Sequence, residues 1–472
     1  MKADRRTGGQ AARSVNIRVA IVGAAVLLSA SPPARLSAQV GAPLPPTSPA
    51  YAITNATIVP VVGNRIARGT VVIRDGKIAA VGAGIAVPPD AAVIDANGLF
   101  VYPGMIDAGT QMGLQEVGQG APGTVDTREL GEFNPQDNAI VAVNPFSEII
   151  PTTRVNGITS VITAPEGNQI SGEAALIDLT GWTTQEMAVN ARAGMVMTYP
   201  RVGGGGGGFG GGGGGFGQQT PEQQRERMQR EARALRDYLA NAKAYAETRA
   251  RNANSTEVQT NLAMEAMIPV MRGEIPAVFD VETADQIRGV LSLADSFGLK
   301  VILRGAQYGW ELADTLAARH IPVVVGPTTV LPAATDPYDM IYANPGVLAR
   351  AGVTIAFRTD DVADSRNLPY NAALATAYGL DPEEALRALT INAARMFGAG
   401  DRLGSIEAGK VANLIVTTGD PLDVRTTTRY VFIRGQPMPY NDKHTRLYDQ
   451  FRNRPRPAAQ PAAPATTAPT RP

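Results

Sequence analysis

Hydrophobic and polar residues change their spacing along the chain, and the first part has the pattern of β-strands. Short runs rich in β-branched residues occur at residues 52–62, 70–73, 77–81 and 93–95. Asp75 and Gly76 lie between two of these runs, and an Asp-Gly pair in that place is a strong signal for a hairpin turn. The sequence therefore predicts an antiparallel hairpin early in the folded chain.

A second β-rich set lies far downstream, at residues 413–417 and 430–433. Neither set has enough strands to bury a face by itself, so we expect the two sets to meet. The product would be a small β-sandwich, with residues 50–102 as its N-terminal part and residues 401–440 as its C-terminal part.

The middle of the chain, residues 103–400, alternates apolar runs with helical patterns. Strands are expected at residues 158–163, 277–280, 300–303, 321–325 and 353–357, and helices at 284–297, 308–319 and 369–378. Asp381 should cap a further helix that runs to about Met396, with Glu384 closing a capping box. Strands that alternate with helices imply parallel pairing, and their number favours an α/β fold with a TIM-like (β/α)8 barrel.

Composition marks the segments that interrupt this pattern. Residues 39–49 are rich in proline and are expected to be a linker. Residues 203–217 are glycine interrupted by two phenylalanines, and no Lys-Ser or Lys-Thr closes them as in a phosphate-binding loop. Residues 220–251 predict one long solvated helix, whereas residues 452–472 have the composition of a disordered tail.

Residues 1–38 have the pattern of a secretory signal peptide, with basic residues before an apolar run and small residues before the expected cleavage after Ala38. The apolar run is too short to span a bilayer comfortably, and an uncleaved anchor is the alternative. Arg5 and Arg6 raise the twin-arginine route, although Thr-Gly-Gly follows them. We expect a secreted or periplasmic protein without a transmembrane segment once the signal is removed.

Composition also limits the chemistry. The 472 residues include 43 basic and 43 acidic side chains, no cysteine and two histidines. The lack of cysteine excludes disulfides, thiolate nucleophiles and zinc ribbons. With two histidines, any mechanism that needs three or four imidazoles is excluded. The equal numbers of basic and acidic residues give no indication of nucleic-acid binding.

Several motifs occur in a familiar order. Ala-Ile-Thr-Asn-Ala-Thr begins at Ala52, Val-Ile-Arg-Asp-Gly-Lys-Ile at Val72, Pro-Gly-Met-Ile-Asp at Pro103, Asp-Pro-Glu-Glu-Ala-Leu at Asp381 and Gly-Ser-Ile-Glu-Ala-Gly-Lys at Gly404. Together they resemble the amidohydrolase superfamily, closest to its imidazolonepropionase-like branch. The resemblance implies the same barrel and β-sandwich, and hydrolysis of carbon–nitrogen bonds other than ordinary peptide bonds.

The resemblance also assigns four metal-binding histidine positions, and this chain has no histidine at any of them. The two positions after Pro-Gly-Met-Ile-Asp hold Gly109 and Gln111, and the later two hold Asp280 and Arg304. Glycine offers no donor, a Gln amide is a poor zinc ligand, and a guanidinium has no free lone pair. Asp360 alone keeps its expected place, that of the family's metal-binding, proton-shuttling aspartate.

Neither histidine of the chain can substitute for the missing ones. His320 precedes a predicted strand, at the barrel end opposite to the chemistry, and is expected to be structural. His444 follows the last predicted strand of the sandwich and is expected to be solvated.

Two hypotheses of different class follow. In the first hypothesis, which we favour, the metal site is degenerate. The protein then binds a small ligand, or it serves as a partner subunit. As a partner it would form a homo-oligomer or a hetero-oligomer with an active homologous subunit. No cofactor is expected, and Arg304 would pair with Asp280 or Asp360 in the electrostatic place of the metal. The alternative for these side chains is that they are solvated loop charges.

In the second hypothesis the protein is an active amidohydrolase. Carboxylates would hold one divalent cation (Mg²⁺, Mn²⁺ or Zn²⁺), and Asp360 would be the general base acting on an amide substrate. The candidate pocket residues under either hypothesis are Gln111, Asp280, Glu282, Arg304, Asp360 and Asp361. Asp107 is mostly structural in the family, and no serine-nucleophile motif is present.

Overall fold

The computed structural model describes residues 43–117, 121–201, 220–252, 259–332 and 337–455. The predicted signal peptide and the glycine-rich segment lie outside these residues, as do parts of the predicted linker and tail. In the described residues no helix is both long enough and apolar enough to cross a membrane.

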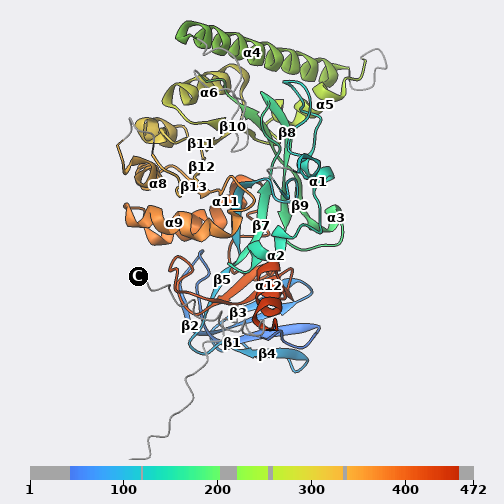
Figure 1. Cartoon of the computed structure of the whole chain (residues 1–472), viewed down its shortest axis with the longest axis vertical. Coiled ribbons are helices and arrows are strands. Elements are labelled where there is room, and N and C mark those ends of the chain that lie inside the picture. Colours follow the sequence, from blue (N-terminus) through green and yellow to red (C-terminus); the bar gives the residue numbers. More distant parts are fainter. Residues whose placement is uncertain (1–42, 118–120, 202–219, 253–258, 333–336, 456–472) are drawn as a thin grey trace, which may run out of the picture. The chain divides into compact units, whose positions relative to one another are not determined.

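One sheet contains strands from both β-rich sets (Figure 1). Its order is β16-β15-β14-β5-β1-β2-β3, and β4 pairs with β1. The strands are β1 Ala50–Ile58, β2 Ile66–Arg74, β3 Lys77–Gly82, β4 Ala91–Asp95, β5 Phe100–Pro103, β14 Leu414–Thr417, β15 Thr428–Ile433 and β16 Gln436–Pro437. The Asp75-Gly76 turn joins β2 to β3 in an antiparallel pair, which confirms the predicted hairpin.

The two sets join where β14 runs antiparallel to β5, with Leu414 opposite Pro103. Their shared core includes Tyr51 and Phe432, whose rings meet edge to face at 5.6 Å between centroids. The two sets are thus hydrogen-bonded into one sheet, and the predicted sandwich of two packed sheets stays a prediction.

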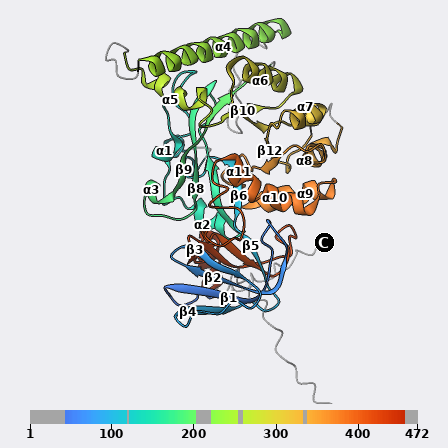
Figure 2. The same cartoon turned by 180° about the vertical axis from the view of Figure 1, so that it is seen from behind.

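The second sheet is a nearly closed barrel (Figure 2). Its order is β13-β12-β11-β10-β9-β8-β7-β6. The strands are β6 Met105–Thr110, β7 Ile158–Thr163, β8 Ile170–Asp178, β9 Ala188–Thr198, β10 Ala277–Val281, β11 Val301–Gly305, β12 Val323–Val325 and β13 Ile355–Phe357. Just after β13, the Asp360 amide donates to the Gly109 carbonyl of β6 at 3.0 Å, which brings the first and last strands together. The α/β barrel predicted from the sequence is confirmed.

The barrel departs from the expected (β/α)8 pattern at β8. This strand is antiparallel to both of its neighbours, and the sequence pattern identified neither β8 nor β9. Glu173 stands in the middle of β8 yet is buried, because Arg192 of β9 donates to both of its carboxylate oxygens at 2.8 Å. The sequence analysis did not identify β8 because a charged residue lies at the middle of this strand. The expectation of parallel strands throughout was wrong, because β8 is antiparallel to β7 and β9.

Twelve helices are described, and α6, α8 and α9 lie outside strands β10 to β13 (Figure 1). They are α1 Ala139–Ala142, α2 Ile149–Arg154, α3 Thr184–Met187, α4 Pro221–Arg251, α5 Leu262–Met271, α6 Ala284–Phe297, α7 Ala313–Ala318, α8 Met340–Arg350, α9 Leu368–Ala377, α10 Pro382–Ala388, α11 Ile391–Met396 and α12 Lys443–Arg452. Helix α6 coincides with its prediction because Thr283 and Gln286 form a capping box and Gly298 ends the helix in a left-handed conformation.

Three helix predictions need correction. Helix α4 is as long as expected but is not solvated all round, since Leu235, Leu239 and two alanines on one face are buried. The helix predicted from Asp381 to about Met396 is two helices, α10 and α11, because Thr390 between them has a non-helical backbone. The helix predicted at residues 308–319 is a 3₁₀ turn, Gly309–Leu312, followed by the short α7.

The predicted capping box at Asp381 is only half formed. The Asp381 carboxylate accepts from the amides of Glu383 and Glu384, as an N-cap should. The Glu384 carboxylate instead accepts from Asn392 Nδ2 at 2.9 Å. The predicted reciprocal bond from Glu384 was therefore wrong.

Candidate functional site

The family's expected ligand positions converge at one end of the barrel. Gly109 lies on β6, Asp280 on β10 and Arg304 on β11, each near the carboxyl end of its strand. Gln111 follows β6 directly, and Asp360 lies three residues after β13. Carboxyl ends of parallel strands form the mouth at which barrel enzymes carry their chemistry.

Arg304 and Asp280 form a bidentate ion pair. The two residues face each other in the register of β10 and β11. Arg304 Nε donates to Asp280 Oδ1 and Nη2 to Oδ2, each at 2.5 Å. Burial would lower the pKa of Arg304, yet the Asp280 carboxylate raises it above its ordinary value, so the guanidinium stays charged.

Arg358 adds a second cation to the same cluster. Its Nη1 lies 2.8 Å from Asp360 Oδ1 and 3.4 Å from Asp280 Oδ1, and its Nε donates to the Gly326 carbonyl at 3.0 Å. Partial burial raises the pKa of the Asp360 carboxyl, against the opposing effect of Arg358 and Arg304. The sequence-based prediction missed Arg358, although an arginine two residues before Asp360, where the family has glycine, was a usable signal.

Gly109 leaves the space that the two arginines occupy. A Cβ atom on Gly109 would lie 3.2 Å from both Cβ and Cδ of Arg358, and 3.5 Å from Cδ of Arg304. The alkyl chains of the arginines therefore pack directly over this part of β6. An imidazole at this position would overlap them.

Glu166 is the second residue that the sequence-based prediction missed. It lies three residues after β7, and its Oε2 accepts from Gln111 Nε2 at 2.9 Å. Burial raises its pKa, and the nearby Asp360 carboxylate raises it further. The sequence feature that could have identified Glu166 is a carboxylate three residues after a predicted buried strand.

Asp107 ties β6 to the loop after β13. Its Oδ1 accepts from the amides of Gly109 and Thr359, each at 3.1 Å, and its Oδ2 accepts from the Thr359 hydroxyl. The side chain is fully buried, and burial raises its pKa to about 7. These contacts give Asp107 a structural role at the mouth.

Two of the predicted pocket residues have other partners. Glu282 forms an ion pair with Arg201, and its backbone amide donates to Gln286 at 2.9 Å. Asp361 accepts from the Ala363 amide at 2.6 Å and so closes a turn. Neither carboxylate forms an ion pair with Arg304 or Arg358 in the described residues.

The two histidines lie elsewhere and are exposed. His320 follows α7 with a left-handed backbone, at a φ of 52°. It stands before β12, at the opposite end of that strand from the mouth. His444 lies in the first turn of α12, with Nε2 3.2 Å from Arg366 Nη1.

The donors at the mouth do not fit a divalent cation as they are arranged. Asp280 is bonded through both oxygens to Arg304, Asp360 is paired with Arg358, and the Gln111 amide donates to Glu166. Over the part of the chain that the structure describes, no group of three or more His, Cys, Asp or Glu side chains could hold a metal.

Comparisons with known proteins agree with the fold. The sequence profile of the Amidohydrolase family matches residues 339–444. Imidazolonepropionases from Porphyromonas gingivalis and Sphingopyxis alaskensis are 30% and 31% identical over 190 and 202 residues, which is 34% of this chain in both cases. These alignments cover 45% and 49% of the two relatives, so the chain spans about half of the length of each.

A crystal structure of an amidohydrolase from Thermotoga maritima MSB8 is similar over most of both chains. It has a TM-score of 0.72 and 28% identity, and the match covers 82% of this chain and 99% of that one. Together with the family profile, this similarity confirms the resemblance found in the sequence. These matches in sequence and in structure support the assignment of the chain to the amidohydrolase superfamily.

Proposed function

We propose that this protein is a ligand-binding member of the amidohydrolase superfamily with little or no metal-dependent hydrolysis of carbon–nitrogen bonds. The observation that carries the proposal is the bidentate pair of Arg304 and Asp280 at positions where the family has metal-binding histidines. The fixed positive charge of the guanidinium occupies the electrostatic role of the metal.

Electrostatics supports this proposal. Two unit charges about 4 Å apart interact by roughly 4 kcal/mol at the effective dielectric constant near a protein surface, and a divalent ion doubles that repulsion. A cation beside Arg304 and Arg358 would meet two such charges and would also have to displace existing ion pairs. A bound metal ion, which lowers the pKa of its water ligand in the family's mechanism, is therefore disfavoured at this site.

The groups left for a ligand are mainly hydrogen-bond acceptors. The Asp360 side chain is 41% exposed. Among the residues of the mouth, the Glu166 carboxyl accepts a hydrogen bond from the side-chain amide of Gln111. We expect a small molecule with amide or amine N–H groups, such as an N-acyl amino acid or a dipeptide-like compound, to donate to these carboxyl groups.

A metal and activity assay tests the proposal. Protein purified without chelator is analysed for metal, and hydrolysis is measured on a panel of N-acyl amino acids and dipeptides. We expect metal well below one equivalent per chain and no turnover. A full equivalent of zinc or manganese, with turnover lost in Asp360→Ala but kept in Asp361→Ala, would favour the active amidohydrolase instead.

A partner-subunit role is tested by co-purification from the native source. We expect the isolated protein to bind a panel compound by itself, and Asp360→Ala to weaken that binding. Co-purification of an active homologous subunit would add a partner role, whereas a homo-oligomer without ligand binding would contradict the proposal.

We also propose that the protein is secreted or periplasmic, because residues 1–38 have the composition of a signal peptide. The mature protein should begin at Gln39. N-terminal sequencing of the exported protein checks this, and recovery of uncleaved chain from the cytoplasm would contradict it.

A further inference from the structure

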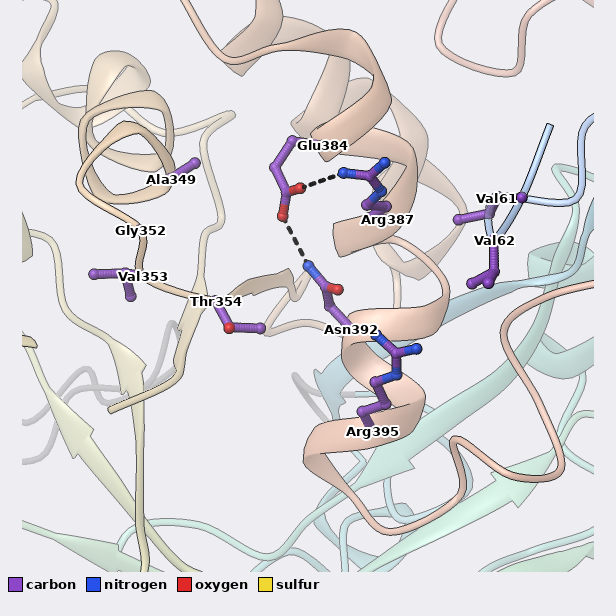
Figure 3. A pocket seen from close by; sticks show the side chains of 11 residues that line it. Val61, Val62, Ala349, Gly352, Val353, Thr354, Glu384, Arg387, Asn392 and Arg395 are labelled. Carbon is purple, nitrogen blue, oxygen red and sulfur yellow. Dashed lines mark hydrogen bonds and ion pairs between the residues drawn. The ribbon is translucent and has the colours of Figure 1, made fainter. Parts of the chain in front are cut away.

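A cavity of about 480 Å³ lies at the end of the barrel opposite to the Arg304 cluster (Figure 3). Val353 and Thr354, which directly precede β13, line it, whereas Arg358 and Asp360 of the mouth follow β13. The cavity is thus separate from the site described above. Its volume falls in the range of small-molecule sites.

The polar lining comes mainly from α10 and α11. Glu384 and Arg387 belong to α10, and Asn392 and Arg395 to α11. In Figure 3 Arg387 and Arg395 project from successive helices, the Arg387 guanidinium lies beside Glu384, and Val61 and Val62 lie on a separate segment of the lining. Two cations and one carboxylate therefore line the cavity.

Contacts within the protein leave hydrogen-bond donors of Arg387 and Arg395 without an acceptor in the described residues. Glu384 accepts from Asn392 at 2.9 Å, and its other oxygen lies 3.6 Å from Arg387 Nη1, which is beyond hydrogen-bonding distance. The Arg395 guanidinium interacts electrostatically with Glu407 but forms no hydrogen bond or ion pair with any described residue. The Arg395 guanidinium, together with the N–H donors of Arg387 that its ion pair with Glu384 does not use, can therefore bind an external anion.

The backbone at Val61 and Val62 points to the same chemistry. Val61 has a φ of 69°, a left-handed conformation that is unusual for a β-branched residue. Strained backbone of this kind is often retained where a segment contacts a ligand. The amides of Val61, Val62 and Gly63 donate to no acceptor in the described part of the chain.

We infer that this cavity binds a small organic anion through a phosphate or carboxylate group held by Arg387 and Arg395. Both groups present the oxygen acceptors that a guanidinium fork matches. The wall of valine and alanine side chains, with Gly352 bordering open space, leaves room for a short carbon skeleton.

The test measures binding of inorganic phosphate and of succinate at constant ionic strength, by calorimetry and by the shift in melting temperature. We expect at least one of them to bind saturably and to stabilise the fold. Tighter binding of phosphate would identify a phosphate ligand, and tighter binding of succinate a carboxylate ligand. Failure of both to stabilise the protein beyond matched sodium chloride would overturn the inference.

Variants locate the binding. The double substitution Arg387→Gln with Arg395→Gln should weaken binding at least tenfold, whereas Arg288→Gln, at an exposed arginine on α6, should leave it unchanged. Because the double variant can lose stability, Val62→Glu serves as a second probe, placing a negative charge on the rim. Unchanged affinity in the double variant and in Val62→Glu would rule out this cavity, and equal loss in Arg288→Gln would show only a general charge effect.

Discussion

Asp280 and Arg304 stand opposite each other on adjacent parallel strands and are joined by two hydrogen bonds of 2.5 Å. The Arg304 side chain is 5% exposed. Replacing Asp280 with Ala leaves this buried cation without its main partner. We expect a loss of about 3–5 kcal/mol in the free energy of unfolding, measured by urea denaturation.

The control for this substitution is Asp285→Ala, which breaks the exposed pair of Asp285 with Arg288. Exposed pairs contribute ~1 kcal/mol or less, so this variant should stay close to the wild type. Equal small effects in both variants would show that the Arg304 pair does not organise the mouth.

Packing around Gly109 predicts a clash. A Cβ at this position would be 3.2 Å from two carbons of Arg358. We expect Gly109→Ala to destabilise the protein by about 1–3 kcal/mol, because the packed arginines must shift. Gly123→Ala, where an added Cβ meets nothing within 4 Å, is the matched control.

A double-mutant cycle identifies the neighbour responsible. In an Arg358→Ala background the added methyl group at position 109 has space, so its cost should shrink. Strict additivity of the two substitutions in denaturant titrations would argue against direct packing between them.

Asp107 predicts a pH dependence of stability. Its pKa is raised from 3.8 to about 7 in the folded protein because the carboxyl is buried. The folded state therefore favours the neutral acid, and the resulting stabilisation is complete below pH 3.8 and is lost as the pH rises through about 7. Between pH 5 and pH 8 the loss should be on the order of a few kcal/mol.

Asp107→Asn removes the titrating proton while keeping one acceptor oxygen. Unfolding free energies of both proteins at pH 5 and pH 8 give the comparison, and the wild type should lose more stability than the variant. Identical pH slopes would mean that Asp107 ionises in the folded protein as easily as in the unfolded chain.

Removal of metal should have no effect on the fold. Because the acidic groups at the mouth are bound to arginines or an amide, incubation with EDTA should leave the melting temperature within about 1 °C of the untreated protein. Differential scanning fluorimetry measures this directly. A large fall that added zinc reverses would show a structural metal site.

The sequence predicted the outline of the barrel. The family resemblance placed Asp280 and Arg304 on successive strands, and the structure shows them opposite each other in the register of those strands. The sequence left open whether Arg304 pairs with Asp280 or with Asp360, and the structure shows the pair with Asp280.

Other features depended on tertiary contacts. Arg358 and Glu166 carry no motif of their own, and their place at the mouth follows from loop paths after β13 and β7. Strand β8 was missed because it contains Glu173, and a charged residue argues against a buried strand. Its burial is possible because Arg192 pairs with it, and this contact is known only from the folded structure. The break at Thr390 lies in an otherwise continuous helical pattern, and packing decides it.

The absence of a side chain at Gly109 restricts which substitutions the barrel mouth can accept. A histidine introduced there would crowd Arg358, while removal of Arg304 would leave Asp280 with its longer contact to Arg358, and removal of Arg358 would break the ion pair of Asp360. A histidine at position 109 would therefore need room that the side chain of Arg358 now fills. Substitutions at Gly109, Arg304 and Arg358 should consequently depend on one another in their effect on stability.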